Sequence, residues 1–347
     1  MIVSEMSANP EMYIKNMKGE QKMRKVIVLA GLIAVLGIVI SANASTTTAW
    51  TGEEDNAWQN DNNWTNGAPP QNPPSPYSSW YANIGKDSAG NPGLTIISDQ
   101  AWAAYVQVGG NYSAKGAAEL RLEAGDYTVD FYRKTYDDLG YLMVGKFADA
   151  TTAGTVNQYG GNLTLGYYST AKKDISLSIG GGGLGYYTIY GGSIYAKGYL
   201  NLGRGGGTGH FTIVGSGASS IKANGFNISS TSTLTFKING DGNIGITTIE
   251  IVDDYFDGDV SFAGTDNIIV DISAGGPFAS SYTLMTWTGS ESGTPSLDLP
   301  DNWTWNSDTW QTDNKIVVTV PEPTTLVLVL MGMGTYLGIT RKKRRLS

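Results

Sequence analysis

The chain has 347 residues, of which 31 are acidic, 23 are basic and none is cysteine. Between residues 45 and 320 there are 27 acidic against 13 basic side chains, so we expect no nucleic-acid partner, because such a surface repels phosphate polymers. The lack of cysteine excludes disulfides and thiol chemistry, and the single histidine excludes a site that needs two imidazoles.

Residues 1–44 have the composition of a leader and signal peptide. Basic side chains precede an apolar run from Val26 to Ile40, and small residues follow at Ala42 and Ala44. This order is typical of a secretory signal with an A-x-A cleavage site, whereas the apolar run is short for a membrane span. We therefore predict a signal helix that engages the Sec translocon and is cleaved after Ala44. A buried core helix is the alternative.

Residues 45–100 are rich in tryptophan and asparagine, with Trp50, Trp58 and Trp64 close together. We interpret this segment as an N-terminal cap for the strands that follow. The open end of a stack of strands exposes edges that pair with other chains unless something covers them.

Residues 101–240 contain an internal repeat with two short glycine-containing motifs, which we call glycine phrases. One phrase starts with glycine and alternates apolar and polar side chains; the other precedes it and ends in glycine. The first phrase occurs at residues 154–163, 185–194 and 209–217, and the second at residues 142–145, 177–180 and 200–203. Repeats of this length are typical of stacked units that cannot bury a face alone.

The repeat pattern predicts an all-β fold. Alternation gives each short strand one inward face, and glycine allows the backbone to turn a corner through positive φ. Stacked coils of this kind form a β-solenoid, for which we expect a right-handed parallel β-helix with β-rich caps. An antiparallel β-sandwich built from the same short strands is the alternative.

Residues 241–319 keep the alternation but lose the glycine phrases, as in residues 267–272 and 282–287. Alternation is the pattern of strands with one buried face. We expect this segment to form a β-rich C-terminal cap.

An acidic cluster is the single candidate metal site in the sequence. Asp253, Asp254, Asp257 and Asp259 surround Gly258, and several oxygens around a turn can hold calcium. The spacing matches neither an EF-hand loop nor the calcium repeat of solenoids. A solvated acidic turn is therefore the preferred interpretation, and we predict no cofactor.

Other motifs in the repeats suggest surface and turn positions more than chemistry. His210 precedes Phe211, and alternation places the histidine on the outer side of its strand. The glycine runs at 180–185 and 203–207 lack the lysine and hydroxyl of a phosphate loop and are expected to be turns. We predict no catalytic residues. Several tyrosines of the repeats would form a strip for stacking on sugar rings if they were exposed on one face. They are Tyr167, Tyr168, Tyr186, Tyr187, Tyr190, Tyr195 and Tyr199.

Residues 320–347 combine a short motif, an apolar stretch and a basic cluster. Pro321, Glu322 and Pro323 precede an apolar stretch at 324–340, which is 17 residues long and near the lower limit for a membrane span. Because basic flanks stay cytoplasmic, we predict a transmembrane helix with the upstream chain outside the inner membrane. An ordinary C-terminal anchor is the alternative. The basic cluster consists of Arg341, Lys342, Lys343, Arg344 and Arg345.

This tail resembles the PEP-CTERM sorting domain, with Pro321, Glu322 and Pro323 at the motif positions and the helix and basic cluster in the family's order. The glycine phrases of the repeats are similar to those of β-helix passengers in PEP-CTERM and autotransporter-like proteins. The resemblance implies processing by an exosortase-type membrane enzyme in biofilm-forming, exopolysaccharide-producing Gram-negative bacteria.

These features predict an exported, non-enzymatic structural protein of the cell surface or extracellular matrix. It would be membrane-anchored before sorting, and then held in the cell envelope or secreted, with extracellular polysaccharide as a further expected partner. Two alternatives stay open: a carbohydrate-active enzyme on a β-helix, either polysaccharide lyase or glycosidase, and an adhesin.

Overall fold

The computed structural model describes most of the chain between residues 46 and 321. The described ranges are residues 46–69, 80–86, 89–109, 116–129, 141–146, 153–166, 175–215, 218–238, 246–254, 258–264, 267–272 and 278–321. The predicted signal peptide with Ala42 and Ala44, and the predicted tail beyond Pro321, lie outside these ranges. Among the described residues, no helix is long and apolar enough to cross a membrane.

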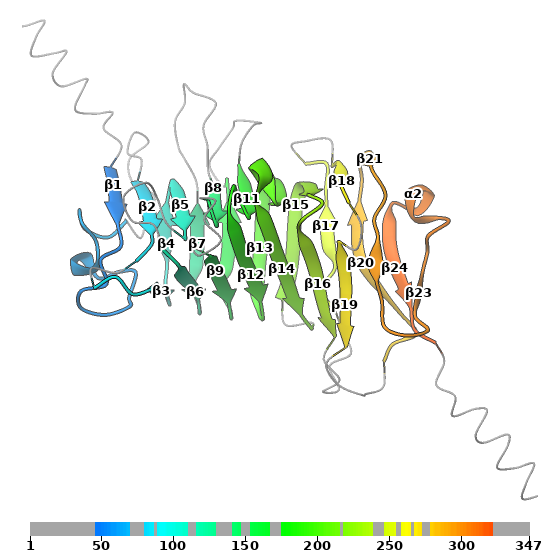
Figure 1. Ribbon diagram of the computed structural model, residues 1–347, viewed down its shortest axis with the longest axis horizontal. Coiled ribbons are helices and arrows are strands. Elements are labelled where there is room, and N and C mark those ends of the chain that lie inside the picture. The colour runs from blue at the N-terminus through cyan, green and yellow to red at the C-terminus, as the bar shows by residue number, and fades with distance from the viewer. Residues whose placement is uncertain are drawn as a thin grey trace, which may run out of the picture.

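The strands of the described part of the chain form three series. Within each series, hydrogen-bonded strands follow one another along the long axis of the molecule (Figure 1). The first contains β1 (Thr46–Ala49), β2 (Trp80–Ile84), β5 (Tyr105–Val108), β8 (Tyr141–Val144), β11 (Ser176–Ile179), the second halves of β13 (Gly192–Leu202) and β15 (Ala218–Ile228), β18 (Val260–Phe262) and β21 (Glu291–Ser292). The second contains β3 (Gly93–Ile97), β6 (Ala118–Leu122), β9 (Gly154–Gln158), β12 (Leu184–Ile189), β14 (Thr208–Val214), β16 (Thr233–Ile238), β19 (Ile268–Ile272) and β22 (Leu297–Asp298). The third contains β4 (Ala101–Ala103), β7 (Asp126–Val129), β10 (Asn162–Leu165), the first halves of β13 and β15, β17 (Ile249–Ile251), β20 (Ser281–Trp287), β24 (Lys315–Thr319) and β23 (Thr304–Trp305).

Strand pairing within these series is parallel except where β24 meets β20 and β23. The described helices are single turns: η1 (Asp61–Asn63), η2 (Arg204–Gly206) and α2 (Trp310–Asp313). The predicted all-β fold is confirmed, and its long parallel sheets are consistent with the predicted β-helix. The alternative, an antiparallel sandwich, is wrong for the described residues, because all strand pairs except those of β24 are parallel and join equivalent strands of successive repeats.

The glycine phrases of the sequence align in register in the structure. Gly185 on β12 pairs with Gly154 on β9 and with Gly209 on β14. In the first series, Leu177 pairs with Leu142 of the preceding repeat and with Leu200 of the following repeat. The repeat units inferred from the sequence are therefore the units that pair.

The core is made of ladders of like side chains, one from each repeat. In the second series, Val156, Tyr187 and Phe211 occupy paired positions and are fully buried. The rings of Tyr187 and Phe211 meet edge to face, with centroids 5.5 Å apart. Burial of such side chains is the main stabilising contribution, at roughly 25 cal/mol per Å² of apolar surface.

Glycine is required at the corner that follows β11. Gly180 has a φ of 73°, and its N–H donates a hydrogen bond to the carbonyl of Val144 at 2.8 Å. A Cβ at this position would lie 2.3 Å from backbone atoms of Thr208 on β14. Gly145 and Gly203 have positive φ at the equivalent corners after β8 and β13. Successive repeats therefore approach more closely here than a side chain allows.

The tryptophan-rich segment between β1 and β2 bonds to strands near the start of two series. The backbone N–H of Trp58 donates to the carbonyl of Ile96 on β3, and the backbone N–H of Trp50 donates to the carbonyl of Asn83 on β2, both at 2.9 Å. The rings of Trp50 and Trp58 pack edge-on against Trp64, with centroids 5.1 and 4.9 Å apart. All three are buried, so the segment satisfies backbone groups at the open end while adding its own core.

The opposite end is closed by the antiparallel strands and α2. Trp310 of α2 is buried and contacts Phe262 and Trp287, with ring centroids 6.0 and 5.8 Å apart. β24 pairs antiparallel with β20 and occupies the strand edge at which a further parallel repeat would pair. The parallel pairing of this series therefore ends at β20.

Candidate functional site

The candidate site is the outer face of the second series, around β6, β9, β12 and β14. In the described part of the chain the exposed large apolar side chains are Tyr159, Tyr186, Tyr190 and Ile272, at 49, 39, 42 and 36 % exposure. The three tyrosines lie on or directly after β9 and β12, which are adjacent. Exposed apolar side chains that gather on one face mark interaction surfaces, whereas scattered ones do not. We call this surface the tyrosine face, consisting of Glu119, Arg121, Asn157, Tyr159, Tyr186, Thr188, Tyr190 and His210.

Strand alternation decides which tyrosines reach solvent. Successive side chains of a strand point to opposite faces. Along β12 and the residue after it, Tyr187 and Ile189 are fully buried, whereas Tyr186, Thr188 and Tyr190 lie on the opposite, solvent-facing side. Of the adjacent tyrosines that the sequence suggested for sugar stacking, Tyr186 is therefore exposed and Tyr187 belongs to the core.

Two pairs of stacked rings stand on the tyrosine face. Tyr159 and Tyr190 are nearly parallel, with centroids 4.9 Å apart and planes inclined by 5°. Tyr186 and His210 stack with the same centroid distance and an inclination of 16°. Each pair joins equivalent positions of successive repeats, so the stacks follow from the register of β9, β12 and β14.

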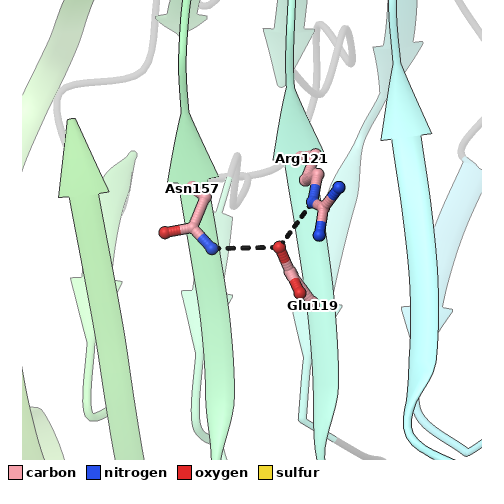
Figure 2. Close-up of polar contacts among 3 residues, drawn as sticks. All are labelled: Glu119, Arg121 and Asn157. Atoms are coloured by element: carbon pink, nitrogen blue, oxygen red, sulfur yellow. Dashed lines mark hydrogen bonds and ion pairs between the residues drawn. The ribbon is translucent and has the colours of Figure 1, made fainter. Parts of the chain in front are cut away.

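A charged pair with an amide partner lies on the adjoining strands. Arg121 Nε donates to Glu119 Oε1 at 2.7 Å, and Asn157 Nδ2 donates to the same oxygen at 3.0 Å (Figure 2). Glu119 and Arg121 lie on the same side of β6, and Asn157 on β9 pairs with Arg121. The three side chains thus form one hydrogen-bonded group across two repeats.

The charge state of this group follows from its contacts. Burial raises the pKa of Glu119, but the hydrogen bonds from Arg121 and Asn157, together with the charge of Arg121, outweigh it and hold the pKa below its usual value of 4.5. Glu119 is therefore ionised at neutral pH, and with Arg121 it forms a pair without net charge.

Gln158 anchors the corner from which Tyr159 projects. Its Nε2 donates to the carbonyls of Gly161 and Ser193, at 3.2 and 3.0 Å, and its Oε1 accepts from the hydroxyl of Tyr187 at 2.7 Å. Burial raises the pKa of Tyr187, so its hydroxyl stays protonated and remains a donor. These bonds hold the backbone next to Tyr159 in one place.

His210 occupies the outer side of β14, as alternation predicted, but it is half-buried instead of fully exposed. Its Nδ1 lies 2.7 Å from Thr233 Oγ1 on β16, and its ring stacks on Tyr186. Partial burial lowers the pKa of His210, so the ring is neutral at neutral pH. It acts as an uncharged member of the tyrosine face.

The predicted calcium ligands lie in another part of the chain, after β17. Asp253 and Asp254 are exposed, and Asp259 Oδ1 accepts a hydrogen bond from the N–H of Ser290 at 2.8 Å. Asp257 lies outside the described residues. Among the described residues, no three His, Cys, Asp or Glu side chains are grouped so that they could hold a metal ion. The solvated acidic turn stays the preferred interpretation of this cluster, with calcium binding as the alternative.

The remaining sequence-predicted features are turns and half-buried side chains. The glycine runs after β11 and β13 contain Gly180 and Gly203 at positive φ, which confirms them as corners. Tyr195 and Tyr199 on β13 are half-buried, while Tyr167 and Tyr168 lie outside the described residues.

Sequence reasoning missed the members of the tyrosine face on β6 and β9. Glu119 and Arg121 lie on β6 and Asn157 lies on β9. Glu119 and Asn157 are 38 residues apart in the sequence, and no motif connects them. The signal that could have found them is the repeat alignment, because residue 118 pairs with residue 154 and brings the following outward positions together.

Comparison of the chain with protein-family models, with curated proteins and with solved structures found no match.

Proposed function

We propose that the chain is an exported structural protein of the cell surface or extracellular matrix, with its parallel strands wound into a right-handed β-solenoid. The observation that carries this proposal is the in-register pairing of equivalent residues in successive repeats, from β2 to β21 in the first series and from β3 to β22 in the second. Repeats that contact only their neighbours build an extended, quasi-one-dimensional body with a large lateral surface. Such a body is suited to display.

Delivery would use the two ends of the sequence. In this proposal the Sec translocon exports the chain and a signal peptidase cuts after Ala44. The apolar stretch at 324–340 holds the intermediate in the inner membrane, with the basic cluster at 341–345 on the cytoplasmic side. An exosortase-type enzyme then acts at Pro321, Glu322 and Pro323 and passes the body to the envelope or the matrix.

The acidic composition favours uncharged partners over anionic ones. Residues 45–320 hold 27 acidic against 13 basic side chains, and this excess keeps an extended body soluble and separate from other acidic polymers. The absence of cysteine makes the body independent of the redox state of the compartment.

A glycosidase role would need a general acid near a second carboxylate, with the pKa of the acid raised toward neutrality. On the tyrosine face Glu119 has its pKa lowered, which favours a permanently ionised partner for Arg121 over a proton donor. The group therefore fits recognition better than hydrolysis.

Cell fractionation tests the proposed delivery. The wild-type chain is expected in the envelope or medium fraction, and a variant with Pro321, Glu322 and Pro323 all replaced by alanine is expected to accumulate in the inner membrane. The variant Asp253→Ala/Asp254→Ala, which alters exposed acidic residues elsewhere, is the matched control and should be sorted as wild type. Recovery of the intact wild-type chain from the soluble cytoplasm would refute the proposal.

A further inference from the structure

We propose that the tyrosine face binds an uncharged polysaccharide, with its two ring stacks as contact surfaces for sugar rings and the Glu119, Arg121 and Asn157 group as the hydrogen-bonding partner of sugar hydroxyls. This inference specifies a partner for the proposed surface role, but binding by the purified chain can be measured whether or not the chain is exported.

The first step of the argument is the arrangement of the aromatic rings. Tyr186 lies on β12 and Tyr190 follows directly after this strand, and both are exposed on its solvent-facing side. The small hydroxyl side chain of Thr188 lies between them. Rings with an apolar face and a polar edge suit sugars, which present C–H faces and hydroxyl edges.

The second step is the support behind the rings. Tyr159 and Tyr190 are held against each other at 4.9 Å, and Gln158 fixes the corner beneath Tyr159 through buried hydrogen bonds. Tyr186 is held against His210 in the same manner. Because the rings are already ordered by neighbouring repeats, little side-chain entropy is lost when a ligand binds.

The third step is charge. Arg121 is paired with Glu119 at 2.7 Å, and further along the same sheet Lys237 Nζ lies 3.7 Å from Asp271 Oδ2. Among the described residues of this sheet, these pairs leave no positive patch on the outer face, and the body has an acidic excess. An acidic polysaccharide or a nucleic acid would be repelled, whereas an uncharged polymer of hydroxyl groups would not.

The fourth step is hydrogen-bonding capacity. Glu119 uses one oxygen for both Arg121 Nε and Asn157 Nδ2. In Figure 2 one terminal nitrogen of Arg121 and the amide oxygen of Asn157 point away from Glu119. The group therefore offers both donors and an acceptor to a hydroxyl-bearing ligand, in a geometry that the shared carboxylate fixes.

Binding by the purified full-length chain tests the proposal, with soluble β-1,3-glucan, β-1,4-linked glucose oligomers and mannan as neutral probes and polygalacturonate as the acidic probe. At least one neutral probe is expected to bind in calorimetric titration, and polygalacturonate is not. The double variant Tyr159→Ala/Tyr190→Ala should weaken that binding by about tenfold or more.

The control variant is Ile272→Ala, which removes an exposed apolar side chain from β19, three strands away from β12 on the same sheet. It should leave the affinity within about twofold of wild type, and thermal unfolding of both variants should match wild type because the altered side chains are exposed. Absence of binding to every neutral probe, a preference for polygalacturonate, or equal loss in the Ile272 variant would each overturn the proposal. None of these results depends on where the cell delivers the chain, so the fractionation experiment remains a separate test.

Discussion

Replacement of Gly180 by alanine is expected to destabilise the protein by about 2–4 kcal/mol, measured by urea unfolding followed by circular dichroism. Part of this loss is the strain of placing an L side chain at a φ of 73°. The other part is a clash, since the new Cβ would lie 2.3 Å from the backbone of Thr208 on β14. Backbone atoms of a packed strand cannot move aside as the end of a flexible side chain can.

Gly205→Ala is the matched control for this prediction. Gly205 also has positive φ, at 67°, but a Cβ there would meet no atom within 4 Å. Its loss should therefore be confined to the backbone strain, about 1–2 kcal/mol. Equal losses in the two variants would show that the close approach between successive repeats does not exist.

Replacement of Trp58 by alanine is expected to cost about 3–5 kcal/mol, the range for removal of a large buried aromatic side chain. Trp58 is fully buried, and its ring contacts Trp64 and Tyr127 with centroids 4.9 and 5.4 Å apart. The backbone N–H of Trp58 donates to the carbonyl of Ile96, so loosening this residue also uncovers the edge of β3. We expect self-association of the variant in size-exclusion chromatography, because an open strand edge pairs with other chains.

Trp305→Ala provides the comparison at the other end of the molecule. Trp305 is half-buried on β23 and packs only at the margin of the core. Its removal should cost clearly less than that of Trp58 and should leave the elution volume in size-exclusion chromatography as in wild type. A smaller loss for Trp58 than for Trp305 would contradict the role given to the N-terminal segment.

The register of the fold could be predicted because its signals are local. Gly154, Gly185 and Gly209 open equivalent strands, and the short phrases between them alternate without interruption. A glycine at a corner and an alternating run are both determined by backbone sterics within a few residues. This is why the repeat units and the parallel pairing agree with the sequence, while the sandwich alternative does not.

The tyrosine face could not be predicted in the same way. The contact of Glu119 with Asn157 joins two repeats whose connecting segment has its own length, so sequence spacing alone does not bring them together. Adjacent Tyr186 and Tyr187 look equivalent in the sequence, and only the inward position of Ile189 shows which of the two is exposed. Both facts require the register to be known first.

The intact mass of the mature protein, purified from its native cell, tests the central claim of export and sorting most directly. The account predicts a chain that begins at Ser45 and has lost the basic cluster at 341–345, recovered from the envelope or the medium. A mass that retains both the N-terminal leader and the basic cluster, in a chain recovered from the cytoplasm, would contradict it.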